Sequence, residues 1–138
     1  MPGPDAPPQP RILLVDDDDL LAESVAEYLR RHGYAVQVAG EGRVAMDLLA
    51  RQRYELVISD IFMPEVDGIE LLGLLRRCIP APAVIAMSGS GVGRVECMLK
   101  MASVLGASRT LGKPFQPAHL IRLVHELIGP AGVKVAAG

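Results

Sequence analysis

Short runs of apolar residues alternate along the chain with longer segments in which apolar residues recur at helical spacing. The short runs are typical of buried strands, and the longer segments are typical of helices with one apolar face. This alternation occurs five times and predicts βα units around a parallel sheet. The expected strands are residues 12–15, 35–38, 56–58 and 83–87, with a short fifth strand near Thr110 and Leu111.

The expected helices carry recognisable signals at their ends. Asp18 or Asp19 can cap the first helix, and Gly33 is placed to end it. Gly106 can end the fourth helix, and the fifth should run over 117–128. The residues that mark the five helices are Leu20, Leu21, Val25 and Leu29; Ala45, Leu48 and Leu49; Ile69, Leu71, Leu72 and Leu75; Val95, Met98, Leu99, Ala102 and Leu105; and Leu120, Ile121, Val124 and Leu127.

Length and composition predict one ordinary globular domain with flexible ends. The chain has 138 residues, half of them hydrophobic, and we expect the domain over residues 11–128. Residues 1–10 contain five prolines and predict a disordered leader, and residues 129–138 predict a flexible tail. Because no apolar run approaches the roughly 20 residues of a membrane helix, we expect a cytoplasmic protein without membrane contact.

Charge and cysteine usage argue against two kinds of site. The net charge is −2, and no run of basic residues interleaved with aromatics occurs, so we expect no direct nucleic-acid contact. Cys78 and Cys97 lie in apolar segments without CxxC spacing, which argues against a zinc site or a disulfide. The histidines lack ligand spacing and are expected at the surface; they are His32, His119 and His125.

Polar residues follow four of the five expected strands. Asp16 and Asp17 come after the first strand, Asp60 after the third, Ser88 after the fourth and Lys113 after the fifth. Taken singly, the aspartates could be helix caps or turn residues, and the serine and lysine could be solvent-exposed. The carboxyl ends of parallel strands meet at one edge, however, so together these residues predict a single crevice.

The residue types in this crevice point to phosphoryl chemistry. Three carboxylates held close together repel one another unless a cation shares their charge, and an all-oxygen site suits Mg²⁺. A carboxylate can also attack phosphorus, provided that cations neutralise the phosphoryl oxygens. Lys113 would supply one such cation, and Ser88 a hydroxyl donor.

On its motifs the chain resembles the receiver domains of bacterial two-component response regulators, in particular single-domain regulators of the chemotaxis type. The resemblance extends over about residues 11–128 and implies a flavodoxin-like, doubly wound α/β fold with strand order 2-1-3-4-5. The matching motifs are the pair Asp16 and Asp17, the run Asp60-Ile61-Phe62-Met63-Pro64 with Gly68, Ser88 with Gly89, and Lys113-Pro114-Phe115.

The resemblance also implies roles for the crevice residues. Asp60 would be the phosphoacceptor, and Asp17, Asp60 and the backbone carbonyl of Phe62 would bind Mg²⁺ directly. Asp16 would act through metal-bound water. Ser88 and Lys113 would contact the phosphoryl group.

The resemblance further implies a cis bond between Lys113 and Pro114. Two features depart from the family pattern. Thr110 replaces the usual aromatic residue, so an aromatic ring cannot report activation. Residues 89–93 are unusually rich in glycine, and ordering of this loop is an alternative readout.

As a receiver domain, the chain would be a signalling switch and not an enzyme, apart from self-phosphorylation and slow autodephosphorylation. A histidine kinase or phosphotransfer protein would donate the phosphoryl group, and a downstream protein would recognise the result. The face made by the fourth helix, fifth strand and fifth helix could bind a target or a second copy. A stand-alone regulator is favoured over a piece of a longer one.

Two alternatives stay open. A Mg²⁺-dependent phosphohydrolase would also use an aspartate nucleophile, but enzymes of that class place a second aspartate two residues later. Phe62 occupies that position and cannot act as acid or base. A pseudo-receiver would keep the fold and bind partners without phosphorylation.

Overall fold

A computed structural model of the chain describes residues 9–60, 68–78, 80–88 and 106–130. The elements in chain order are β1 (Arg11–Val15), α1 (Asp19–Arg31), β2 (Ala35–Ala39), α2 (Gly42–Arg51), β3 (Leu56–Asp60), α3 (Gly68–Arg76), β4 (Ala83–Ser88), β5 (Arg109–Gly112) and α5 (Pro117–Ile128). The predicted strands are each confirmed to within two residues. The predictions that fall outside the described residues concern most of the leader (1–8), Phe62, the loop 89–93, the helix marked by residues 95–105 with Cys97, and most of the tail (131–138).

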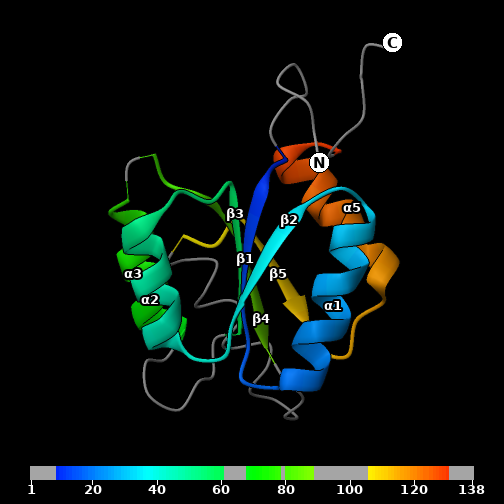
Figure 1. The fold of residues 1–138 in the computed structure, drawn as a ribbon, viewed down its shortest axis with the longest axis horizontal. Helices are drawn as coiled ribbons and strands as arrows, with labels where there is room; N and C mark the ends of the chain where they lie inside the picture. The colour runs from blue at the N-terminus through cyan, green and yellow to red at the C-terminus, as the bar shows by residue number, and fades with distance from the viewer. Residues whose placement is uncertain (1–8, 61–67, 79, 89–105, 131–138) are drawn as a thin grey trace.

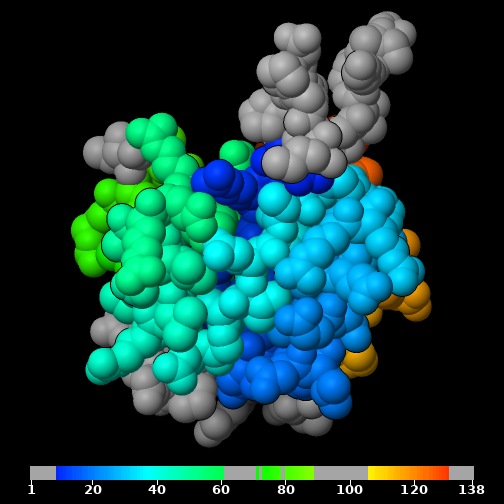
Figure 2. All heavy atoms as spheres, in the orientation of Figure 1, coloured from blue at the N-terminus to red at the C-terminus, as the bar shows by residue number. Residues whose placement is uncertain are grey.

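The five strands form one parallel sheet in the order β2-β1-β3-β4-β5, which confirms the expected fold class. In Figure 1, α1 and α5 lie on one side of this sheet, and α2 and α3 lie on the other. The space-filling view shows how completely α1, β2 and α2 cover the face turned to the viewer (Figure 2). The chain places β2 on one side of β1 and β3 on the other, so the strand order reverses at β1. The point of reversal lies between the carboxyl ends of β1 and β3.

The core has two layers because successive side chains of a strand point to opposite faces. In β1, Ile12 and Leu14 pack with α1 and α5, whereas Leu13 and Val15 pack with α2 and α3. All four side chains are at most 1% exposed. Each such side chain stabilises the fold by about 1.5–3 kcal/mol through burial, so both layers hold the sheet rigidly.

The structure corrects the apolar pattern of two helices. Leu20 is 84% exposed and takes no part in the core, although it was expected on the apolar face of α1. Ala22 and Ala26 fill that face instead, beside Val25 and Leu29. In α5 the buried residues are Leu120, Leu123 and Val124, and Ile121 and Leu127 are only partly buried.

The ends of α1 follow the expected rules. The side chain of Asp18 accepts a hydrogen bond from the backbone N–H of Leu21 at 3.1 Å, so Asp18 and not Asp19 is the cap. At the other end Gly33 adopts φ +94°, a conformation that favours glycine. His32 and His119 are exposed as expected.

Tyr34, the residue before β2, links the start of this strand to the end of α5. Its phenol donates a hydrogen bond of 2.6 Å to the carbonyl of Gly129, which is 95 residues away in sequence. Tyr34 is 1% exposed, and its ring centre lies 6.3 Å from that of His125. His125 was expected at the surface, and it is only partly exposed because it packs beside Tyr34.

Among the helices given above, none has both the length and the apolar character that a bilayer span requires.

Candidate functional site

The expected site residues lie at the carboxyl edge of the sheet. Asp16 and Asp17 follow β1, Asp60 ends β3, Ser88 ends β4 and Lys113 follows β5. The strands are in a register that aligns these ends, because Val15 pairs with Ser59, Asp60 with Met87, and Ser88 with Gly112. Parallel pairing therefore carries residues from four parts of the sequence to one edge.

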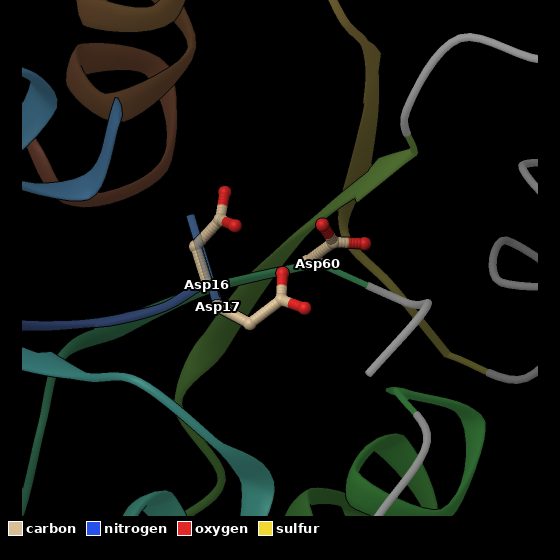
Figure 3. Close-up of side chains that lie close together, drawn as sticks. All are labelled: Asp16, Asp17 and Asp60. Atoms are coloured by element: carbon tan, nitrogen blue, oxygen red, sulfur yellow. The ribbon is translucent and has the colours of Figure 1, made fainter. Parts of the chain in front are cut away.

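Three carboxylates form the centre of this edge. Asp16, Asp17 and Asp60 each offer an oxygen atom, and these atoms lie within 4.8 Å of one another. Figure 3 shows the three side chains at the ends of neighbouring strands, with the carboxyl groups of Asp17 and Asp60 close together. Asp16 is 1% exposed and Asp60 6%, whereas Asp17 is exposed. Asp17 is thus the member of the cluster that faces solvent most openly.

Lys113 pairs with two of these carboxylates. Its Nζ lies 2.6 Å from Oδ2 of Asp16 and 3.0 Å from Oδ2 of Asp60. Burial by itself lowers the pKa of Lys113, but the hydrogen bonds that its ammonium donates to Asp16 and Asp60, together with their negative charge, outweigh it and raise this pKa above its usual value. The lysine is therefore a fixed cation between the two strands.

The oxygens of Asp16 are both engaged within the protein. Oδ1 accepts a hydrogen bond of 3.0 Å from the backbone N–H of Asp18, and Oδ2 accepts the bond from Lys113. For Asp17, by contrast, no hydrogen bond or ion pair occurs with any of the described residues. Asp17 is therefore open to a ligand, whereas each oxygen of Asp16 already accepts one hydrogen bond within the protein.

The donor set fits a hard divalent cation. All three groups are carboxylates, and a single lysine offsets only part of their charge. Hard oxygen ligands of this kind are the ones that Mg²⁺ prefers. The fourth expected ligand, the carbonyl of Phe62, lies outside the described residues.

Ser88 and the segment after β5 complete the edge. Ser88 is fully buried, and its carbonyl accepts a hydrogen bond of 2.8 Å from the N–H of Lys113. The bond between Lys113 and Pro114 is cis, as the family resemblance implied. Thr110 lies in β5, half-buried and paired with Ala86.

Sequence reasoning missed an apolar cavity beside the carboxylates. A cavity of about 560 Å³ extends from Asp16, Asp17 and Lys113 between α1 and α5. The side chains that give it its apolar character are Leu21, Val25, Tyr28, Phe115 and Leu120. Phe115 was in the matched Lys113-Pro114-Phe115 motif, but nothing in the linear sequence indicated that it would line a cavity with α1.

Comparison with known proteins agrees with this geometry. The model of the response regulator receiver domain matches residues 12–125. The chain is 33% identical over 117 residues to "Probable transcriptional regulator ycf29" of Porphyra purpurea, a match that covers 85% of the chain and 56% of that protein. It is 36% identical over 115 residues to an "Uncharacterized 14.6 kDa protein" of Leptolyngbya boryana, which covers 83% of the chain and 87% of that protein.

The same relationship appears among solved structures. The receiver domain of the Francisella response regulator 1452 superposes with a TM-score of 0.77 at 29% identity, covering 86% of this chain and 96% of that one. The chain spans about half the length of the Porphyra regulator and between 24% and 57% of several other curated regulators. Motifs, fold and site geometry agree with the matched model, and the chain belongs to the response regulator receiver domain family.

Proposed function

We propose that this chain is a phosphorylation-dependent switch in which Asp60 accepts a phosphoryl group. Receiver domains of this family serve phosphorylation-dependent signalling and are not generally enzymes in their own right. The observation that carries the proposal is the placement of Asp60, buried at the end of β3, beside the carboxylates of Asp16 and Asp17 and 3.0 Å from the ammonium of Lys113. A nucleophile, a cation and a candidate metal site thus meet at one point.

Asp17, Asp60 and the carbonyl of Phe62 would hold Mg²⁺, with Asp16 contributing through water. The exposed position of Asp17 and the buried position of Asp16, whose oxygens already accept one hydrogen bond each, support this division of roles. When bound, the ion supplies positive charge that offsets the repulsion between carboxylates and phosphoryl oxygens.

The transfer itself exchanges one bond to phosphorus for another. A carboxylate oxygen of Asp60 forms a bond to phosphorus as the bond from phosphorus to the donor's imidazole nitrogen breaks, and the imidazole leaves with that electron pair. Lys113 would pair with a phosphoryl oxygen, and the hydroxyl of Ser88 would donate to another. Both residues already lie at the edge where Asp60 ends its strand.

Response regulators act with kinases and with downstream targets. For this chain we propose a histidine kinase or phosphotransfer protein as donor and a protein as target. The contact face would include β5 and α5 and could also join two copies of the chain. Because β5 carries Thr110 in place of an aromatic residue, the change on phosphorylation would be transmitted by packing between β5 and the end of β4 at Ser88.

Intact-mass spectrometry after incubation with acetyl phosphate tests the proposal. We expect a Mg²⁺-dependent gain of one phosphoryl group in the parent chain and none in Asp60→Asn. Asp19→Asn is the matched control, because Asp19 begins α1 in the same acidic run but lies outside the cluster. No gain in a folded parent with Mg²⁺ present would contradict the proposal and favour a pseudo-receiver that binds partners without phosphate.

A further inference from the structure

Arginines gather at the edge of the sheet opposite the phosphoacceptor. Helices of this fold run back against the strands, so helices end where strands begin, as Figure 1 shows for α1, α2 and β1. Eight of the ten arginines in the described segments lie at these helix ends and strand starts. They are Arg11, Arg30, Arg31, Arg51, Arg53, Arg76, Arg77 and Arg109.

Part of this cluster has an ordinary structural explanation. Four of the arginines form ion pairs with nearby acids: Arg30 with Glu23, Arg31 with Glu27, Arg51 with Asp47, and Arg109 with Glu126. The last turns of α1, α2 and α3 also favour cations through the helix dipole. These two effects account for all but three members.

Arg11, Arg53 and Arg77 remain unexplained by pairing or by a helix dipole. Arg11 begins a strand, and Arg53 and Arg77 lie beyond the ends of α2 and α3. Across the described ranges none of the three forms an ion pair with an acidic side chain, and all three are exposed. Arg11 donates a hydrogen bond of 2.9 Å to Gln52, and its backbone N–H donates one of 2.8 Å to the carboxylate of Glu55. The surplus of positive charge near the ends of α2 and α3 therefore comes from Arg53 and Arg77.

A cavity lies within this surplus. It has a volume of about 320 Å³ and is bordered by Arg51 and Arg53. Its apolar part is formed by Leu49, Pro80 and Pro82, next to the half-buried thiol of Cys78. Arg77 does not border the cavity itself, but it is exposed and directly precedes Cys78, which does. An apolar hollow between arginines matches an acidic segment that also carries an apolar side chain.

We propose that the cavity bordered by Arg51 and Arg53, together with Arg77, binds an acidic peptide segment of a partner protein, with an apolar side chain of that segment in the cavity. The surface lies at the opposite end of the strands from Asp60. Both surfaces can therefore be occupied at the same time, and this contact does not depend on the phosphoacceptor.

Two other anionic partners fit the observations less well. A nucleic acid is disfavoured because the chain carries a net charge of −2 and because Tyr54, the aromatic residue of the cavity, is 6% exposed with its hydroxyl held by Gln37 and Gln52. A lipid surface is disfavoured because the large exposed apolar side chains of the described part, Leu20 and Val44, begin α1 and α2 at the other edge.

The test is an amide NMR titration with a short peptide of aspartate and glutamate with two spaced leucines. We expect shift changes confined to the segments that border the cavity. The double variant Arg53→Gln/Arg77→Gln should weaken binding about tenfold, whereas Arg31→Gln/Arg122→Gln, which removes the same charge from the side of α1 and α5, should change it less than about twofold.

Several results would overturn the proposal. These are no binding of the peptide, equal loss of binding in the two double variants, or shift changes spread over other surfaces. Tighter binding of a single-stranded oligothymidylate or of phosphatidylserine vesicles to the same residues would also overturn it, because the surface would then recognise polyanions in general. Unchanged phosphorylation of each variant by acetyl phosphate confirms that the protein is folded.

Discussion

The two edges of the sheet hold charges in opposite ways. At the carboxyl edge, the ammonium of Lys113 lies within 3.0 Å of each of two buried carboxylates, and Asp16 is 1% exposed. At the amino edge, the arginines are exposed and their ion pairs lie open to solvent, with side chains such as Arg31 at 75%. Because water screens exposed charges, the ion pairs at the amino edge contribute little to the free energy of unfolding. At the carboxyl edge, loss of one buried partner would cost much more, because the other charge would stay buried without it.

Removal of the lysine should break this comparison most strongly. Lys113→Met leaves Asp16 and Asp60 buried without their cation, and we expect a loss of about 3 kcal/mol in the free energy of unfolding. Urea denaturation in the absence of divalent metal measures it. Arg31→Met at the amino edge is the control, because its ion pair with Glu27 is exposed, and it should cost less than about 0.5 kcal/mol. Equal losses would mean that burial does not distinguish the edges.

The same ion pairs predict an alkaline loss of stability. The carboxylates raise the folded-state pKa of Lys113 above its usual 10.5, so the folded chain holds this proton more tightly than the unfolded chain. The stabilisation is complete below that value and disappears as the pH rises through the folded-state pKa. Urea midpoints measured at increasing alkaline pH should fall in the parent and stay flatter in Lys113→Met.

Mg²⁺ should stabilise the folded protein by binding at the carboxyl edge. At a free concentration ten times the dissociation constant, one bound ion adds about 1.4 kcal/mol to the free energy of unfolding. Thermal melting with Mg²⁺, and again after addition of a chelator, gives the shift. Asp17→Asn should abolish the shift, and Asp19→Asn should keep it. An unchanged response in Asp17→Asn would assign the ion to other ligands.

Loss of the cap of α1 should have a smaller, local effect. Asp18→Ala removes the hydrogen bond to the N–H of Leu21, and we expect a cost of about 1 kcal/mol. Denaturant unfolding measures it, and Asp18→Ser should recover most of the loss. A cost close to zero, or no recovery in Asp18→Ser, would contradict this role of the Asp18 side chain.

The ion pairs of the amino edge should give the smallest effect. A double-mutant cycle on Arg51 and Asp47, whose side chains are 71% and 60% exposed, should return a coupling of at most about 0.5 kcal/mol. Added salt should reduce it further. A coupling above 1 kcal/mol, as for a buried pair, would remove the contrast between the edges.

The carboxyl edge could be predicted from the sequence, and the amino edge could not. Each residue of the first follows an apolar run, and strand ends in a parallel sheet share one edge, so Asp16, Asp60 and Lys113 could be brought together in advance. The arginines follow helices of different lengths and form no run in the sequence. Their gathering depends on where each helix stops.

Helical spacing was also an incomplete guide to burial. Leu20 is apolar and fits the helical spacing, but it lies in the first turn of α1 on the side away from the sheet. The small residues Ala22 and Ala26, which carry little hydrophobic signal, pack there instead because they let α1 approach the sheet closely. The hydrogen bonds of Asp16 depend on side-chain rotamers and likewise required the structure.

The hydrogen bond from Tyr34 to Gly129 has a mechanical consequence. It ties the last turn of α5 to the junction of α1 and β2, two segments that are 95 residues apart in sequence. A force applied to the chain after Gly129 would therefore load the α1–β2 junction before α5 could peel from the sheet. In a single-molecule pulling experiment, Tyr34→Phe would let α5 detach at a lower force than in the parent chain.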